Sequence, residues 1–251
     1  MPVAGVFDSV AKRYDQMNDY MSFGVHRLWK DQFVQNLNPS CLLYRKNNQD
    51  QQISILDVAG GTGDIAFRML QNMEAHSSED GPSYDISVLD INPKMLQVGK
   101  KRAQKRGLAD KLTFIEGNAE NLEQIPSSSI DLYTIAFGIR NCTHIDAVLR
   151  EAYRVLKPGG VFSCLEFGKV SNPLVKSVYS NYSFSLIPLI GQIVAADRDS
   201  YQYLVESIEK FPPQAQFAKL IRDAGFENSV GKGWEDLSMG IAAIHTAVKP
   251  V

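Results

Sequence analysis

The stretch ILDVAGGTGD at residues 55–64 constrains the fold more than any other part of the chain. An apolar run ends on an acidic residue, glycines follow at once, and the pattern then turns helical. A buried strand, a tight loop and a first helical turn have this pattern when the loop must let a nucleotide approach the backbone. The stretch therefore predicts a strand over 53–58, a glycine loop and a helix over 64–74.

Strand-like and helical segments continue to alternate after this loop. Further strands are predicted at 84–92, 112–118, 129–138 and 161–168, the last one after the turn KPGG, with helices at 93–106 and 144–156. Such alternation implies an α/β fold with a doubly wound, mostly parallel sheet, that is, a Rossmann-like architecture. Ligands of these folds bind at the carboxyl ends of the strands.

The length of 251 residues, with 44% apolar and 22% charged residues, suits a single domain with a sizeable core. Two polar runs, at 44–52 and 75–83, are interpreted as surface insertions. The predicted domain has four parts: an N-terminal helical cap at 1–40, a cofactor-binding core at 53–168, a helical lid or insertion at 169–215, and C-terminal strands that complete the sheet at 216–251.

Composition excludes several classes of function. The net charge of -2 disfavours a nucleic-acid-binding surface. Cys41, Cys142 and Cys164 are odd in number and widely spaced, so neither a disulfide framework nor a metal site is expected, and the chain reads as intracellular. The apolar segment 184–196 is too short for a membrane span, and no signal peptide opens the chain.

The glycine loop is compatible with two kinds of cofactor. Gly61, Gly63 and Ala66 fit a G-x-G-x-x-G/A pattern, which also occurs in dinucleotide-binding oxidoreductases but by itself reports only a tight turn with close backbone approach. Asp57 at the end of the strand favours S-adenosylmethionine instead, because a carboxylate there suits an ammonium group and not a pyrophosphate.

Polar residues at the next two strand ends point to the same cofactor. Asp90 closes the second strand and could accept both ribose hydroxyls, and Asn118 closes the third and could bind the adenine amino group. Each residue alone is equally well explained as a helix or turn cap. Their succession at three strand ends favours a site for S-adenosylmethionine.

Two long motifs then identify a resemblance. They are YDQMNDYMSFGVHRLW at 14–29 and RVLKPGGVFSCLEFG at 154–168, with LDVAGGTGD, DIN and FGIRN between them and DSYQYLVESIEKFP at 199–212 after them. The chain resembles the ubiquinone/menaquinone-biosynthesis C-methyltransferase family from about residue 6 to its C-terminus. The resemblance implies a class I S-adenosylmethionine-dependent methyltransferase.

The resemblance also implies a cofactor site. Ala136 and Gly168 stand where a serine is usual, so a side-chain contact at Ala136 is lost and only its backbone could serve. The loop AGGTG, with Ala59, is this family's own form. The expected cofactor-binding residues are Asp57, Gly61, Thr62, Gly63, Asp90, Ile91, Asn118, Ala119 and Ala136.

The implied substrate is a polyprenylated methoxy-benzoquinol, with a demethylmenaquinol of menaquinone biosynthesis as the alternative. Arg140 is expected to stabilise a phenolate, and Asn141 is expected to orient Arg140. His26 and Tyr14 are expected to cover the ring or relay a proton, or to be a surface histidine and a packing tyrosine. Asp199 faces the substrate or caps a helix.

The implied partners are the quinol, a second copy of the chain and a multi-protein ubiquinone-biosynthesis complex, without nucleic acid. The polar insertions favour a eukaryotic member in the mitochondrial matrix, peripheral to the inner membrane, with a targeting peptide outside this sequence. Segment 184–196 is a lid over the polyprenyl tail, a membrane contact, a dimer interface or core. A non-catalytic scaffold of that complex remains the third functional class, beside the oxidoreductase.

Overall fold

The computed structural model describes residues 24–39, 52–77, 82–170, 198–229 and 231–251. The cap motif with Tyr14, the insertion at 44–51 and the segment 184–196 lie outside these residues. The strands are β1 Ile53–Val58, β2 Tyr84–Asp90, β3 Leu112–Glu116, β4 Ile130–Ala136, β5 Leu156–Phe167, β6 Glu227–Asn228, β7 Trp234–Leu237 and β8 Ala242–Val248. The helices are α3 Val25–Leu37, α5 Asp64–Glu74, α6 Pro93–Lys105, α7 Ile145–Val155, α10 Arg198–Lys210 and α11 Gln214–Asp223, with short 3-10 turns η1 Ile139–Asn141 and η3 Ser238–Gly240.

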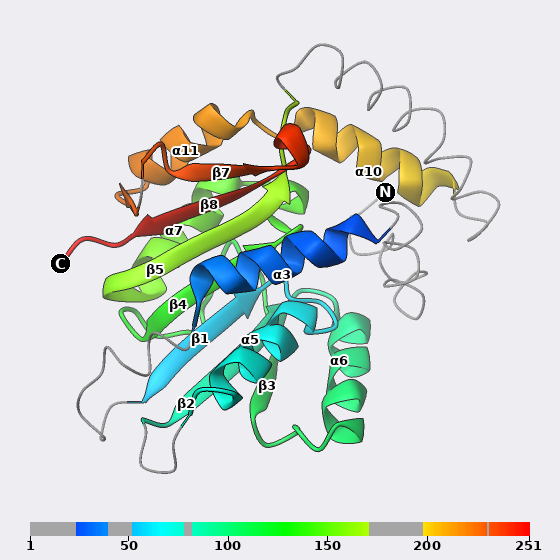
Figure 1. Cartoon of the computed structure of the whole chain (residues 1–251), viewed down its shortest axis with the longest axis vertical. Helices are drawn as coiled ribbons and strands as arrows, with labels where there is room; N and C mark the ends of the chain where they lie inside the picture. Colours follow the sequence, from blue (N-terminus) through cyan, green and yellow to red (C-terminus); the bar gives the residue numbers. More distant parts are fainter. Residues whose placement is uncertain (1–23, 40–51, 78–81, 171–197, 230) are drawn as a thin grey trace.

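The strands form one sheet in the order β3-β2-β1-β4-β5-β8-β6, and β7 also pairs with β8 (Figure 1). The first five strands run parallel, and β8 runs antiparallel to β5. This confirms the predicted α/β fold with a doubly wound, mostly parallel sheet. The order reverses between β1 and β4, which is where such folds bind ligands.

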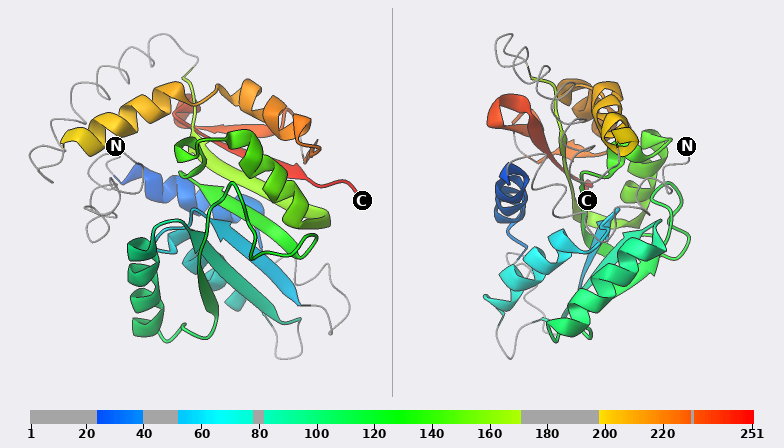
Figure 2. Two further views of the ribbon diagram at one scale, coloured as in Figure 1. Left: turned by 180° about the vertical axis from the view of Figure 1, so that it is seen from behind. Right: turned by 90° about the vertical axis from the view of Figure 1, so that its right-hand side faces the viewer.

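Helices cover both faces of the sheet, and each face has its own apolar core. In β1, Ile53 and Ile55 face the core of α3, α5 and α6, whereas Leu56 and Val58 face the core of α7 and α11. Figure 1 shows α3 and α5 in front of the sheet, and Figure 2 shows α7 on the opposite side. A strand buried on both faces has the near-continuous apolar sequence seen here.

One sequence prediction is corrected. KPGG was expected to be a turn before the last parallel strand, but β5 already begins at Leu156, and KPGG forms a bulge inside it. Leu156 pairs with Ile130 and Val161 with Leu132, so the extra residues bulge out, with Gly159 at a φ of +75°. Residues 216–251 contain the end of α11, which reaches Asp223, and the strands β6, β7 and β8. The division into cap, core and lid remains a prediction.

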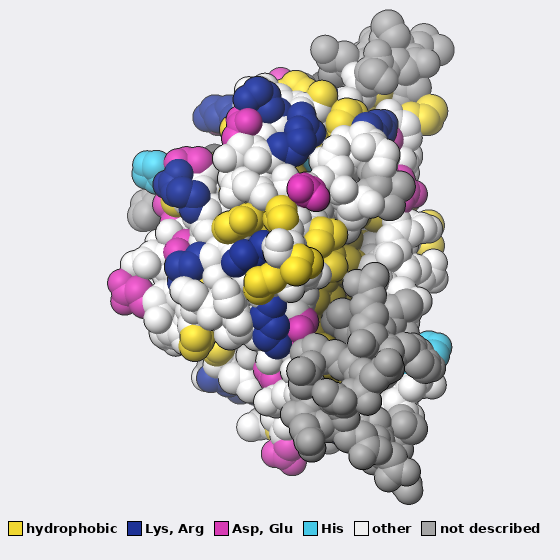
Figure 3. Space-filling model, turned by 90° about the vertical axis from the view of Figure 1, so that its left-hand side faces the viewer, with side chains coloured by type: hydrophobic (Ala, Val, Ile, Leu, Met, Phe, Trp, Pro, Cys, Tyr) yellow, Lys and Arg dark blue, Asp and Glu magenta, His cyan; other side chains and the backbone are white. Residues whose placement is uncertain are grey.

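The side of the molecule that bears the C-terminus is shown in Figure 3. Hydrophobic side chains gather near its centre, with Lys and Arg side chains around them. The arrowheads of β1 and β5 point away from this side in Figure 1. Within the described ranges, no helix is long and apolar enough to cross a membrane.

Candidate active site

The loops that follow β1, β2, β3 and β4 meet at the carboxyl edge of the sheet. The Gly60 N–H donates to the Leu89 carbonyl at 3.1 Å, and the Gly117 N–H donates to the Asp90 carbonyl at 3.0 Å. A Cβ added at Gly138 would lie 2.5 Å from the Ala59 Cβ, so the loops after β1 and β4 also touch. The predicted cofactor residues therefore lie on one continuous edge.

The backbone of this edge is strained at two residues that are not glycine. Ala59 has a φ of 51° and Phe137 a φ of 55°, in the loops after β1 and β4. Gly61 and Gly63 also have positive φ, which glycine adopts without cost. Left-handed non-glycine residues cost free energy and concentrate at functional sites. The structure therefore marks the junction of β1 and β4 independently of any motif.

Asp57 is fully buried beneath the glycine loop. The Thr134 hydroxyl donates to its Oδ1 at 2.8 Å, whereas its buried Oδ2 has no hydrogen-bond partner among the described residues. A Cβ at Gly60 would lie 2.8 Å from that Oδ2, so only glycine leaves room above it. Burial raises the pKa of Asp57 from its ordinary value of 3.8 to about 7. An acceptor left open in this way fits the ammonium group of S-adenosylmethionine.

Asp90 ends β2 and is held in one orientation by two backbone donors. The Gly61 N–H donates to Oδ2 and the Asn92 N–H to Oδ1, both at 2.8 Å. Burial raises the pKa of Asp90, and these hydrogen bonds oppose the shift. Each oxygen keeps a second lone pair, which fits two ribose hydroxyls. Ile91 beside it is 57% exposed, as expected of a residue that lines an open site.

Thr62 occupies a different position from its neighbours in the loop. Its side chain is buried, and its hydroxyl accepts a hydrogen bond from Arg102 of α6 at 3.0 Å. The hydroxyl therefore acts as an acceptor toward α6, and its own O–H is still able to donate.

Asn118 and Ala119 follow β3. Asn118 is exposed, and its Oδ1 accepts the Glu120 N–H at 3.0 Å, which fixes the amide orientation and leaves one lone pair. Ala119 is buried at 8% exposure. Ala136, the last residue of β4, is half-buried and offers only backbone groups.

Arg140 in η1 forms a buried ion pair with Glu166 of β5. Arg140 Nη1 donates to Glu166 Oε1 at 2.9 Å and to the Phe137 carbonyl at 2.6 Å, and the two side chains are 5% and 1% exposed. Burial raises the pKa of Glu166, and Arg140 opposes this shift. Arg140 Nε is buried with no partner within the described ranges. The pair thus holds a cation whose Nε donor is unused.

Asn141 and Tyr203 connect η1 to α10. The Tyr203 hydroxyl donates to Asn141 Oδ1 at 3.3 Å, so the amide N–H groups of Asn141 remain to be used. Burial raises the pKa of Tyr203, and Arg140 opposes this shift. Burial also raises the pKa of the Cys142 thiol to about 12, which argues against a thiolate nucleophile beside the site.

The remaining catalytic candidates are His26, Asp199 and Tyr14. His26 is buried on α3, at 7% exposure, and is not the surface histidine considered from the sequence. Asp199 belongs to α10, but its side chain lies outside the described part, as does all of Tyr14. Their catalytic roles remain predictions. Across the described ranges, no cluster of His, Cys, Asp or Glu could hold a metal ion.

Thr134, Glu166 and Tyr203 were not predicted as site residues from the sequence. Glu166 is an acid within the mostly apolar stretch VFSCLEF of β5, which is a signal that could have been noticed. Tyr203 lies in the segment 199–212 that the resemblance had singled out. Thr134 carried no signal, because its importance depends on the pairing of β4 with β1 opposite Asp57.

The sheet order, the strained loops and the aligned acids define a class I S-adenosylmethionine-dependent methyltransferase. Solved structures share this fold. A SAM-dependent methyltransferase from Aquifex aeolicus aligns with a TM-score of 0.54 at 13% identity, covering 84% of this chain and 89% of that one. Haemonchus contortus phosphoethanolamine N-methyltransferase 2, solved with S-adenosyl-L-methionine, aligns with a TM-score of 0.55 at 16% identity, covering 85% and 53%. At such identities the likeness shows the fold alone.

The chain belongs to the ubiE/COQ5 methyltransferase family, whose family model matches residues 1–249. It is 56% identical over 249 residues to the mitochondrial 2-methoxy-6-polyprenyl-1,4-benzoquinol methylase of Schizosaccharomyces pombe, covering 98% of this chain and 79% of the relative. It is 51% identical over 244 residues to the ubiquinone/menaquinone biosynthesis C-methyltransferase UbiE of Rhodopseudomonas palustris, covering 97% and 89%. These findings confirm the resemblance and the S-adenosylmethionine cofactor.

Proposed function

We propose that this methyltransferase methylates a ring carbon of a polyprenylated methoxy-benzoquinol in ubiquinone biosynthesis. The names of relatives at 51–56% identity support the substrate class. The observation that carries the chemistry is the buried pair of Arg140 and Glu166, in which the Nε donor of Arg140 has no partner within the described part of the chain. A phenol oxygen of the quinol could accept a hydrogen bond from this Nε–H group.

The cofactor residues would bind and align the cofactor. Asp57 would receive its ammonium group, Asp90 its ribose hydroxyls, and Asn118 with Ala119 its adenine edge. When bound, S-adenosylmethionine supplies an electrophilic methyl group on a sulfonium. Alignment of that methyl with the ring carbon is the main contribution of such a site, because the reaction is an in-line displacement.

Arg140 stabilises the phenolate form of the substrate, which arises when the phenol releases its proton to water. An unperturbed phenol has a pKa near 10, so at neutral pH little of the electron-rich phenolate is present. A guanidinium stays protonated and cannot take up that proton. It can donate hydrogen bonds to the developing phenolate, and Glu166 holds it in place and balances its charge. Asn141 is oriented by Tyr203 and offers its amide N–H groups as further donors.

Aromatic side chains border the Arg140 side of the site. The ring centroids of Phe137 and Phe167 are 5.0 Å apart, and Trp29 lies 6.3 Å from Phe137 and 6.2 Å from Phe167. The Arg140 guanidinium carbon lies 5.2 Å from the centroid of Phe167. This wall lowers the local dielectric constant, which strengthens the interaction between Arg140 and a phenolate.

Substitutions of Arg140 test the proposal. Arg140→Lys keeps the charge but loses the planar fork, whereas Arg140→Ala loses both. With a short-tail methoxy-benzoquinol and labelled S-adenosylmethionine, the Ala variant should lose about 2 to 4 kcal/mol of transition-state stabilisation, the effect of deleting a preorganised donor. The Lys variant should keep part of the rate. Raising the pH should partly rescue Ala, because more substrate is then already ionised.

Cofactor affinity is the control, and it should barely change in either variant. Arg150→Ala provides a matched change in an exposed ion pair, with Asp146 at 2.6 Å, and should behave as wild type. If Arg140→Ala loses cofactor binding in proportion to turnover, Arg140 belongs to the cofactor pocket. Normal turnover by Arg140→Ala would move the proton chemistry to His26, Tyr14 or Asp199.

The choice between ubiquinol and menaquinol precursors needs its own assay, because bacterial relatives are named for both pathways. Methylation of the methoxy-benzoquinol with a kcat/KM well above that of a demethylmenaquinol analogue supports the proposal. The reverse preference would place the enzyme in menaquinone biosynthesis. Activity on neither would favour the non-catalytic scaffold.

We further propose that the protein works in mitochondria, peripheral to the inner membrane, as a dimer within a multi-protein ubiquinone-biosynthesis complex. Eukaryotic relatives at 46–56% identity are named mitochondrial, and the substrate carries a membrane-soluble tail. Fractionation of mitochondria with a carbonate wash and light scattering of the purified protein test these statements. A matrix protein that is monomeric and never sediments with membranes would contradict them.

A further inference from the structure

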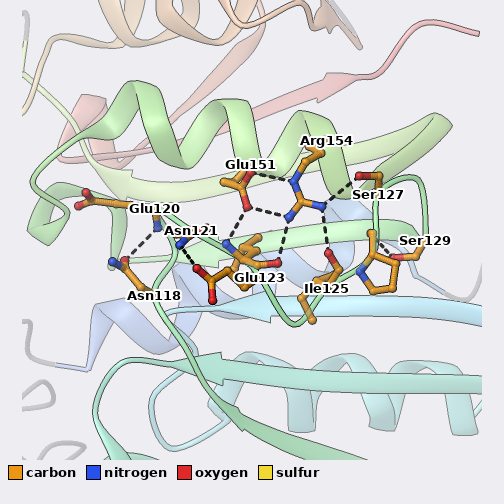
Figure 4. A network of polar contacts seen from close by, with 11 residues as sticks. Asn118, Glu120, Asn121, Glu123, Ile125, Ser127, Ser129, Glu151 and Arg154 are labelled. Atoms are coloured by element: carbon orange, nitrogen blue, oxygen red, sulfur yellow. Dashed lines mark hydrogen bonds and ion pairs between the residues drawn. The ribbon is translucent and has the colours of Figure 1, made fainter.

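The loop between β3 and β4 carries the proposed adenine contacts and is attached to helix α7. Asn118 and Ala119 open this loop, and it returns to the sheet at Ser129. Figure 4 shows Arg154 and Glu151 reaching from α7 into the middle of the loop. Neither residue belongs to the cofactor site as described above.

Arg154 uses every N–H of its guanidinium. Nε and Nη2 donate to the two carboxylate oxygens of Glu151 at 2.8 and 2.7 Å. Nη2 also donates to the Leu122 carbonyl at 2.9 Å, and Nη1 donates to the Ile125 carbonyl at 3.0 Å and to Ser127 Oγ at 3.1 Å. An arginine side chain has five N–H donors in a rigid fork, and here each has an acceptor.

Glu151 completes the attachment from the other side. Its Oε2 accepts the Leu122 N–H at 2.7 Å, so both backbone groups of Leu122 are bound by the pair. The Ser128 and Ser129 N–H groups donate to the carbonyls of Arg154 and Val155, at 2.9 and 2.8 Å. The loop is thus fixed in register along α7.

A second attachment lies next to Asn118. Glu120 Oε1 accepts the N–H groups of Thr143 and His144 at 2.6 and 3.1 Å, and the Glu120 N–H donates to Asn118 Oδ1. The residue that orients the Asn118 amide is therefore itself tied to the start of α7.

We propose that Arg154 and Glu151 are positioning residues for adenine recognition. They hold the loop so that Asn118 accepts the adenine amino group and the backbone at Ala119 meets the neighbouring ring nitrogen. The inference rests on the proposed cofactor role of these two residues. Leu122 and Ile125 are buried at 1% and 7% exposure, so apolar contacts keep the loop on the protein without the pair. Arg154 and Glu151 fix the register of the loop along α7.

The test compares two ligands that differ only at the purine edge that Asn118 and Ala119 are proposed to contact. S-adenosylhomocysteine has the amino group and an acceptor nitrogen next to it, whereas S-inosylhomocysteine has an oxygen in place of the amino group and a hydrogen on that nitrogen. Wild type should bind the adenosyl ligand about ten- to a hundredfold more tightly in calorimetric titration, the effect of two hydrogen bonds. Arg154→Lys keeps the charge but not the fork, and should bind the adenosyl ligand about five- to tenfold more weakly while changing the inosyl ligand less than about twofold.

Arg150→Lys is the matched control, since Arg150 is on the same helix and pairs with Asp146 on the surface, and it should keep the wild-type preference. Glu151→Gln keeps the side-chain shape and serves as the second variant if Arg154→Lys does not fold. Equal weakening of both ligands, or an unchanged preference, would overturn the inference, because a purely structural role predicts those results. Failure of wild type to bind either ligand would overturn the cofactor site itself.

Discussion

The buried carboxyl group of Asp57 should make the stability of the protein depend on pH in a way that one substitution removes. Thr134 satisfies only one of its oxygens, and the other has no partner among the described residues. Asp57→Asn keeps the shape and the hydrogen bond from Thr134 but cannot ionise. Any difference in pH dependence between the two proteins therefore belongs to Asp57.

The sign follows from where each state binds the proton. The folded protein holds it up to the pKa of about 7, and the unfolded chain releases it near 3.8. Between these values unfolding releases a proton. The contribution of Asp57 to the free energy of unfolding therefore falls as pH rises from about 4 to about 7, and it is constant above pH 7. A shift of this size corresponds to about 4 kcal/mol at most, since one pKa unit is about 1.4 kcal/mol.

Urea denaturation of the cofactor-free protein at several pH values between 4 and 8 measures this slope. The difference in unfolding free energy between Asp57→Asn and wild type should increase in favour of the variant as pH rises, and level off near pH 7. The difference in stability between the two proteins at a single pH does not isolate this effect. The amide of Asp57→Asn also buries N–H groups, which costs about 1 to 3 kcal/mol at every pH. Parallel pH curves for the two proteins would refute the assignment of a raised pKa to Asp57.

Cofactor binding gives a second measurement of the same group. At pH 6 a carboxyl group with a pKa of about 7 is about 90% protonated, and an ammonium group placed beside it favours the ionised form. Binding of S-adenosylmethionine at pH 6 should therefore release close to one proton from wild type and none from Asp57→Asn. Calorimetry in buffers of different ionisation enthalpy measures this number. Release by both proteins would place the titrating group elsewhere.

Three further substitutions test other parts of the site. Asp90→Ala should weaken S-adenosylmethionine binding by roughly ten- to a hundredfold, because hydrogen bonds to a charged group contribute about 1.5 to 3 kcal/mol, and an unchanged dissociation constant in a folded variant would remove Asp90 from the site. Glu166→Gln should cost about 3 to 5 kcal/mol of stability in urea denaturation by leaving Arg140 buried without its counter-ion, and a loss below 1 kcal/mol would contradict this. Gly168→Ser should cost about 1 to 3 kcal/mol by overpacking, since a Cβ at Gly168 would lie 2.6 Å from Gln214 Nε2, and a wild-type urea midpoint would show that Gln214 gives way.

Much of the fold was predictable because its signals are local. The helix Asp64–Glu74 was predicted with its observed bounds, and β1 to β4 were placed to within two residues at each end, whereas β5 begins five residues earlier than predicted. KPGG was misassigned because two glycines and a proline read as a turn in any sequence window. Its bulged conformation depends on β4 and on the C-terminal residues, with Gly159 N–H donating to the Lys249 carbonyl at 2.8 Å.

The site divides in the same way. Asp57, Asp90 and Asn118 were identified because each follows an apolar strand, and parallel strands bring their carboxyl ends to one edge. The serine that the family usually has at Gly168 could not be judged from the sequence. Only the structure shows Gln214 and the Gly240 carbonyl filling the space where a side chain would go.

The sequence by itself determined the alternation of strands and helices, the glycine loop and the order of acids along the chain, because each depends on residues within about one turn or strand. Tertiary structure decided which groups act on one another. Arg140 meets Glu166 across 26 residues and Tyr203 meets Asn141 across 62, through pairing of β4 with β5 and packing of α10 on η1. The pKa of Asp57 was likewise decided by burial, which is a property of its surroundings and not of the aspartate itself.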